Sequence, residues 1–289
     1  MNLFVFGLGF SARYFAQRER ARFAAIRATV TDSENAHAIE SETGFSVRAF
    51  GPHADDPRIG GDLADTDVLL ISAPPGPGGD TVLARYAGAI RASRIGWIGY
   101  LSTIGVYGDQ AGAWIDESTE ADPRSARSKE RLAVERAWLA LGAETGKPVQ
   151  VFRLSGIYGP GRNPFVKLRE GKAQRIIKAG QVFNRIHVDD IASALAASLD
   201  RPRHGAIYNV TDDEPAPPQV VTEHAAELAG LPLPPAIDFE TADLSPMARS
   251  FYGENKRVRN RLLRDELGVA LRYPTYREGL AALRDDAAA

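Results

Sequence analysis

The first residues along the chain that are suited to chemistry lie in a glycine-rich turn close to the N-terminus. The segment FGLGFSA carries a G-x-G-x-x-A pattern after the apolar residues 2–6 and before a helical segment at 11–22. The first glycine permits a tight bend, the second lets a pyrophosphate approach the backbone, and the small alanine allows close helix packing. The helix N-terminus adds unpaired N–H groups and a partial positive charge. The pattern predicts a dinucleotide site formed by Gly7, Gly9, Phe10, Ser11 and Ala12, and a purely structural turn is the alternative.

A carboxylate follows this turn at the distance that a dinucleotide site requires. Asp32 closes the second expected strand, 25 residues after Gly7. There it can accept hydrogen bonds from the adenosine ribose and would repel a 2′-phosphate, so it favours NAD over NADP. The alternative is that Asp32 or Ser33 caps the helix that follows.

Alternating apolar and amphipathic segments must hold these residues in place. We expect strands at 2–6, 26–31, 46–50, 67–72, 95–101 and 149–154, with helices near 11–22, 33–42, 80–93 and 126–141. The nearly continuous apolar strands indicate an α/β protein with a Rossmann-type, doubly wound parallel sheet. Glycines and prolines become frequent after residue 154. We therefore expect a dinucleotide-binding domain at 1–154, to which 185–210 return, and a smaller, interleaved substrate lobe from 155–184 and 211–289.

Several further segments together resemble one enzyme family. They are SAPP (72–75), LSTIGVYG (101–108), SARSK (125–129), FRLSGIYGPGRNP (152–164), RIHVDDIASAL (185–195) and YNVTDDEP (208–215). With the glycine turn, they resemble the extended short-chain dehydrogenases/reductases, which include NAD-dependent epimerases and dehydratases. The resemblance implies NAD as the cofactor, with NADP as the alternative. It adds Ser72 and Ala73 to the cofactor site.

The resemblance also assigns catalytic positions, with one departure. In that family a Ser or Thr at the end of the fifth strand works with a Tyr-x-x-x-Lys pair on the next long helix. By position Thr103 matches the hydroxyl, and Lys129 matches the lysine that holds the nicotinamide ribose and lowers the phenol's pKa. Ser125 stands where the family has its tyrosine, and its hydroxyl titrates too high to replace a phenol. Tyr107 is the candidate for a displaced phenol.

Each of these catalytic assignments has a structural alternative. Thr103 could only satisfy backbone groups at a strand end. Lys129 could be one more solvated charge, and Tyr107 a packing aromatic at a turn.

The substrate side is expected to be basic. Seven basic residues and one acid lie between Arg162 and Arg185, which suits an anionic ligand, although a solvated helix gives the same pattern. Nucleotide-sugar epimerases carry a phosphate-binding arginine where this chain has Phe183, two residues before Arg185. We assign substrate binding to Arg162, Asn163 and Arg185.

The composition excludes several classes of protein. The formal charge is −2, with 35 basic and 37 acidic residues, which disfavours nucleic-acid binding despite a basic run at 256–264. There is no cysteine, no zinc motif and no apolar run of membrane-spanning length. We therefore expect a cytoplasmic protein with a small-molecule substrate, no metal, and no nucleic-acid or membrane partner. The sequence is compatible with a homodimer.

Two functions follow from these expectations. The first is an NAD(P)-dependent oxidoreductase or epimerase for a small polar anion, with a modified proton relay. The second is a sensor or regulatory protein that binds NAD(P) without catalysis. Ser125 is the residue that separates them, because an enzyme must rebuild the proton relay and a sensor need not.

Overall fold

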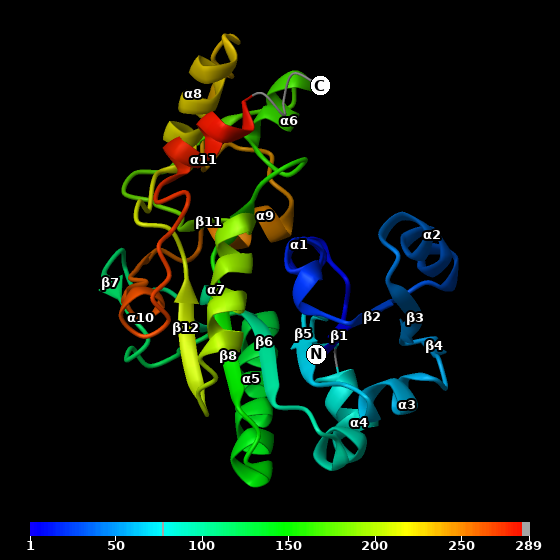
Figure 1. Cartoon of the computed structure of the whole chain (residues 1–289). Coiled ribbons are helices and arrows are strands. Elements are labelled where there is room, and N and C mark those ends of the chain that lie inside the picture. Colours follow the sequence, from blue (N-terminus) through cyan, green and yellow to red (C-terminus); the bar gives the residue numbers. More distant parts are fainter. Residues whose placement is uncertain (77, 285–289) are drawn as a thin grey trace.

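An eight-stranded sheet forms the centre of the protein in a computed structural model that describes residues 1–76 and 78–284. Its strand order is β12-β8-β6-β5-β1-β2-β3-β4, and every pair is parallel except β3–β4 (Figure 1). The strands are β1 (Asn2–Phe6), β2 (Ala25–Val30), β3 (Ser46–Gly51), β4 (Ala54–Asp55), β5 (Val68–Ile71), β6 (Trp97–Thr103), β8 (Val149–Leu154) and β12 (Ala206–Val210). The α/β fold with a doubly wound parallel sheet, expected from the sequence, is confirmed.

The chain reverses its direction across the sheet beside β1. Strand β1 pairs with β2 on one side and with β5 on the other. In doubly wound sheets ligands bind at such a switch point, beyond the carboxyl ends of the strands. The glycine turn that follows β1 therefore lies beside the residues that follow β5.

Four helices cover one face of the sheet. They are α1 (Phe10–Arg18), α2 (Ser33–Thr43), α7 (Val188–Asp200) and α10 (Arg261–Asp265). Phe15, Leu195 and Leu263 from these helices pack with Leu3 and Val5 of β1 in one buried cluster. Late segments of the chain thus complete the core that the first strand begins.

Three helices cover the opposite face, namely α3 (Ile59–Ala64), α4 (Thr81–Ala92) and α5 (Ala126–Thr145). Asp80 joins two of them, because its carboxylate accepts the first amides of α4 and the indole N–H of Trp138 in α5 at 2.9 Å. Helix α5 begins at Ser125, whose Oγ accepts the N–H of Ser128, and ends at Gly146 with φ 68°. A serine at the N-cap and a left-handed glycine at the end fix the register of this helix.

The remaining elements are short and lie mainly at one end of the molecule. Helices α6 (Pro164–Arg169), α8 (Pro218–Ala229) and α11 (Tyr276–Leu283) gather beyond the tip of β12 (Figure 1). Three two-stranded parallel sheets pair β9 (Gly156–Tyr158) with β11 (Arg185–His187), β10 (Arg175–Ile177) with β13 (Ala236–Asp238), and β7 (Trp114–Ile115) with β14 (Arg257–Val258). Helix α9 (Pro246–Phe251) and the short 3-10 helices η1 (Arg20–Arg22) and η2 (Ile104–Tyr107) complete the set. Of the segment 185–210, β12 joins the main sheet, whereas β11 pairs with β9.

Candidate functional site

The first glycine of the turn adopts a conformation that other residues avoid. Gly7 has φ 83°, its N–H donates to Thr29 Oγ1 at 2.9 Å, and its carbonyl accepts the N–H of Gly9 at 2.8 Å. A Cβ at this position would lie 2.6 Å from the backbone nitrogen of Ala73. Both the positive φ and this contact require glycine. Ala73, which the resemblance assigned to the cofactor site, thus packs against the turn from its position just after the neighbouring strand β5.

The N-terminus of α1 is open to a ligand. Gly9 is its N-cap, no side chain caps the helix, and a Cβ on Gly9 would meet nothing within 4 Å. The first amides of the nine-residue helix therefore face space that an anion can occupy. Ala12 is fully buried against the sheet, while Phe10 and Ser11 line a cavity. These observations fit the pyrophosphate of a dinucleotide.

Asp32 is exposed and caps α2. Its Oδ1 accepts the N–H of Glu34 at 2.9 Å, and its Oδ2 accepts from the side-chain amide of Asn35 at 3.2 Å. The capping alternative is therefore confirmed. A contact with an adenosine ribose stays a prediction.

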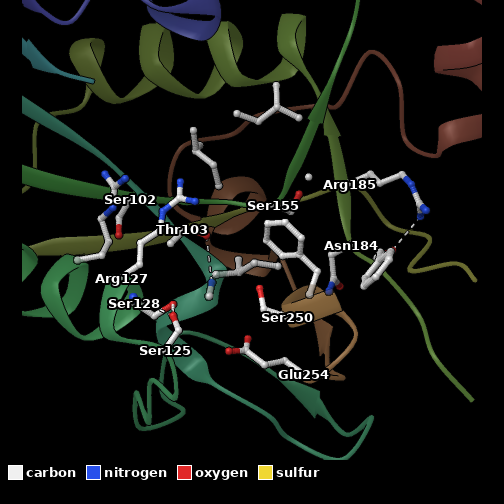
Figure 2. A pocket seen from close by; sticks show the side chains of 18 of the residues that line it. Ser102, Thr103, Ser125, Arg127, Ser128, Ser155, Asn184, Arg185, Ser250 and Glu254 are labelled. Atoms are coloured by element: carbon white, nitrogen blue, oxygen red, sulfur yellow. Dashed lines mark hydrogen bonds between the residues drawn. The ribbon is translucent and has the colours of Figure 1, made fainter. Parts of the chain in front are cut away.

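A cavity of about 890 Å³ begins at α1 and runs along the carboxyl ends of the central strands. Ser72 after β5, Thr103 at the end of β6 and Ser155 after β8 line its floor. One wall is the start of α5, and the other comes from α9 and the residues after it. Figure 2 shows Ser125 and Ser128 on the first wall, with Ser250 and Glu254 across from them.

The hydroxyls at the end of β6 have different surroundings. Thr103 faces the cavity, and its Oγ1 accepts the N–H of Gly105 at 3.1 Å, which starts η2. Ser102 is buried and donates to Glu135 Oε1, which also pairs with Arg153. Thr103 therefore keeps its O–H available for a ligand, whereas the hydroxyl of Ser102 is used inside the protein.

Lys129 is exposed and is not among the residues that line the cavity, and its contact with the nicotinamide ribose stays a prediction. The α5 side chains that do line the cavity are Ser125, Arg127, Ser128 and Arg131. Arg127 and Arg131 have the spacing of the Tyr-x-x-x-Lys pair, because residues four apart share a helix face. Two guanidinium groups with this spacing thus stand on the part of α5 that lines the cavity.

Tyr107 was expected to border the cavity as a displaced phenol, but it does not line it. The ring is fully buried beneath η2, with the Arg153 guanidinium 4.7 Å from its centre. Its O–H donates to Asn209 Oδ1 at 2.8 Å. Burial raises the pKa of this phenol. The packing alternative is confirmed.

Two of the three assigned substrate residues line the cavity. The Arg162 guanidinium lies over the Phe10 ring, 5.6 Å from its centre. Arg185 also lines the cavity, but its Nη1 donates to the carbonyls of Phe183 and Ala216 at 2.9 and 3.2 Å. Asn163 does not line it. This residue caps α6, where its Oδ1 accepts the N–H of Phe165, and its contact with a substrate stays a prediction.

The sequence reading missed the wall that the late part of the chain supplies. Glu254 and Lys256 line the cavity as a pair, with 2.6 Å between Oε2 and Nζ. Lys256 is almost fully buried and also donates to the carbonyl of Gly108. The basic run at 256–264 reads as an exposed helix face whose charge could also touch an anionic ligand, but nothing in the sequence singles out Glu254 as a partner of Lys256.

No metal-binding group of three or more His, Cys, Asp or Glu side chains occurs within residues 1–76 and 78–284. Over the same residues, no helix has the length and apolar character needed to cross a membrane.

Comparisons with known proteins agree with this geometry. The model of the NAD dependent epimerase/dehydratase family matches residues 82–211. The protein YeeZ of Escherichia coli is 30% identical over 220 residues, which is 73% of each chain. A functionally unknown conserved protein from Silicibacter pomeroyi is 50% identical, with a TM-score of 0.90 over 99% of this chain and 98% of that one. The UDP-glucuronic acid 4-epimerase of Bacillus cereus, solved with NAD, shares the fold at 17% identity, with a TM-score of 0.79 over 99% of this chain and 96% of its own.

Proposed function

Because the chain belongs to the NAD dependent epimerase/dehydratase family, we propose that it is an NAD-dependent oxidoreductase or epimerase acting on a small anionic molecule. One observation carries the proposal. A single cavity joins the open N-terminus of α1 to the arginines of α5, so a dinucleotide and an anion can lie in contact.

The cofactor's position follows from the glycine turn. The amides at the start of α1 would hold the pyrophosphate, and Ser72 and Thr103 would line the path of the nicotinamide half. When bound, the nicotinamide supplies or accepts a hydride. The carboxylate of Asp32 favours NAD over NADP, because a 2′-phosphate beside it would be repelled. Solved relatives of the same fold contain NAD, which supports this choice.

The proton chemistry differs from the family's pattern. A guanidinium does not release a proton near neutral pH, but it can donate hydrogen bonds to a developing oxyanion. The cavity's own phenols, Tyr158 and Tyr252, are buried, and burial raises the pKa of both. We therefore assign charge stabilisation to Arg127 and Arg131, with Thr103 as a hydroxyl donor to the substrate oxygen.

Calorimetry with NAD, NADH, NADP and NADPH tests the cofactor assignment. We expect binding of NAD and NADH, and weaker binding of the phosphorylated pair that improves in Asp32→Ala. Failure of all four to bind would refute the proposal. Turnover is then sought with panels of carboxylates and phosphate esters, as a change in NADH absorbance for net oxidation or reduction and by chromatography of the products for epimerisation, and Arg127→Gln should reduce it.

A sensor without catalysis is the second candidate. It is favoured by the positions of Tyr107 and Lys129, neither of which reaches the cavity. Tight NAD or NADH binding with no hydride transfer across both panels would support the sensor and contradict the enzyme.

A further inference from the structure

The charge on the cavity wall is strongly unbalanced. Five basic side chains and one acidic side chain line it, namely Arg127, Arg131, Arg162, Arg185, Lys256 and Glu254. Glu254 is already paired with Lys256. Within residues 1–76 and 78–284, none of the four arginines forms an ion pair with a carboxylate. Several guanidinium charges therefore face one cavity without a counter-ion from the protein.

Arg131 is held ready for a ligand. Its Nη1 donates to the carbonyl of Leu101 at 3.0 Å and to the Tyr100 hydroxyl at 3.4 Å. Its Nε and Nη2 have no hydrogen-bond partner in the described part of the chain, and neither is among the fully enclosed polar atoms. A guanidinium that is fixed and still has free donors suits a carboxylate, which accepts two parallel hydrogen bonds.

The opposite wall presents large apolar side chains beside the polar Ser250, Glu254 and Lys256. Met247 and Phe251 of α9 line the cavity, yet 62% and 59% of their surfaces are exposed. Phe183 and Tyr252 continue this wall, with their rings edge to face at 5.1 Å. Large apolar side chains left open in a cavity gain most from an apolar ligand and little from a sugar covered with hydroxyls.

The features that a nucleoside diphosphate needs are weak here. Phe183 occupies the position of the phosphate-binding arginine that the resemblance implied. Arg185 has its Nη1 fixed by two backbone carbonyls, so it does not replace that arginine with a free fork.

Building on the proposed function, we infer that the substrate is a small amphipathic carboxylate with an aromatic body. Its carboxylate binds Arg127 and Arg131 of α5, and its ring lies against Met247 and Phe251 of α9. The ligand thus bridges the two walls of the cavity.

Calorimetry on the full-length, NAD-saturated protein tests this inference. The probes are benzoate, phenylacetate, hydrocinnamate and cinnamate, with the matching neutral amides, inorganic phosphate and UDP-glucose. We expect at least one carboxylate to bind about tenfold or more tightly than its amide, because a charge-assisted pair is lost in the amide. UDP-glucose and phosphate should not compete. Tighter binding of UDP-glucose, equal binding of acid and amide, or no binding of any carboxylate would overturn the inference.

Matched variants locate the ligand. Arg127→Gln should weaken the carboxylate about tenfold. Arg136→Gln, an exposed arginine of α5 outside the cavity, should change nothing. Phe251→Ser should weaken all four carboxylates, and most strongly the larger ones. Equal effects of the two arginine changes would overturn the inference. Carboxylate binding without NAD binding would instead refute only the proposed function.

Discussion

Replacement of Gly9 by alanine separates cofactor binding from folding. A Cβ at Gly9 would project into the open space above α1, where the proposed pyrophosphate lies. It would displace the phosphate from one or two backbone amides. Each charge-assisted hydrogen bond contributes about 1.5–3 kcal/mol, so NAD affinity should fall roughly tenfold to a hundredfold or more.

The same change should leave the fold almost untouched. Gly9 has φ −80°, which alanine adopts without strain, and the added methyl group meets no atom within 4 Å. Alanine lowers the entropy of the unfolded chain, a gain of about 0.4–1 kcal/mol, but it is a poorer N-cap than glycine by a similar amount. The free energy of unfolding in urea should therefore change by less than about 1 kcal/mol.

Two further glycines provide the controls. Gly7→Ala combines a positive φ with a methyl group 2.6 Å from the nitrogen of Ala73, and should cost about 2–5 kcal/mol. Gly44→Ala has φ 68° but no neighbour within 4 Å, and should cost only about 1–2 kcal/mol. If Gly9→Ala binds NAD like the wild type, the phosphate does not lie at this turn. Equal losses for Gly7→Ala and Gly44→Ala would show that the contact with Ala73 is unimportant.

Three other predictions follow from buried or exposed charges. Glu135→Gln leaves the buried Arg153 without its partner and should lower the free energy of unfolding by about 3–5 kcal/mol, and adding Arg153→Met should recover part of it; no recovery would argue against an isolated charge. Burial raises the pKa of Asp212 well above its usual value, so the charged form destabilises the fold. In urea titrations, wild-type stability relative to Asp212→Asn should therefore fall as pH rises above about 4, the usual pKa of an aspartate, and a constant difference would contradict this. Lys129→Gln should leave both the urea midpoint and NAD affinity unchanged, and a clear loss of affinity would return Lys129 to the site.

The fold could be predicted from the sequence because its signals are local. Strands such as 2–6 and 149–154 are apolar runs of strand length, and the structure has them within those bounds. The glycine turn was recognised because Gly7 satisfies a backbone requirement that few other residues meet, and Gly9 follows it at the spacing of a dinucleotide-binding turn. Such signals need no knowledge of distant parts of the chain.

The cavity wall formed by α5 was predicted less well, because the rotation of this helix about its axis decides which of its side chains face the cavity. The resemblance implied a lysine on this helix, and Lys129 is the lysine of the segment SARSK. Residues 129, 133, 136 and 140 share the exposed side of α5, whereas Arg131, Glu135 and Trp138 share the buried side. A helical projection anchored on Trp138 would have placed Arg131 toward the sheet and Lys129 toward solvent.

The second wall could not be predicted, because long-range contacts create it. Contacts between distant parts of the chain, such as the pairing of β7 with β14 and the hydrogen bond from Gln181 to the carbonyl of Glu254, bring Glu254 and α9 to the cavity. No local pattern in residues 246–256 indicates which strand ends they will face. Asn163 and Tyr107 were not found at the cavity for a related reason. The side chain of Asn163 caps α6 and that of Tyr107 packs in the core, so neither lines the cavity.

The hydrogen bond from Lys256 Nζ to the carbonyl of Gly108 joins positions 148 residues apart. Asn255 strengthens it by accepting the N–H groups of Gln110 and Gly112 on its carbonyl. The last strand of the main sheet ends at Val210, whereas the cavity wall depends on these later contacts of Asn255 and Lys256. A chain truncated before residue 254 would keep the glycine turn but lose Glu254 and Lys256 from the wall of the cavity.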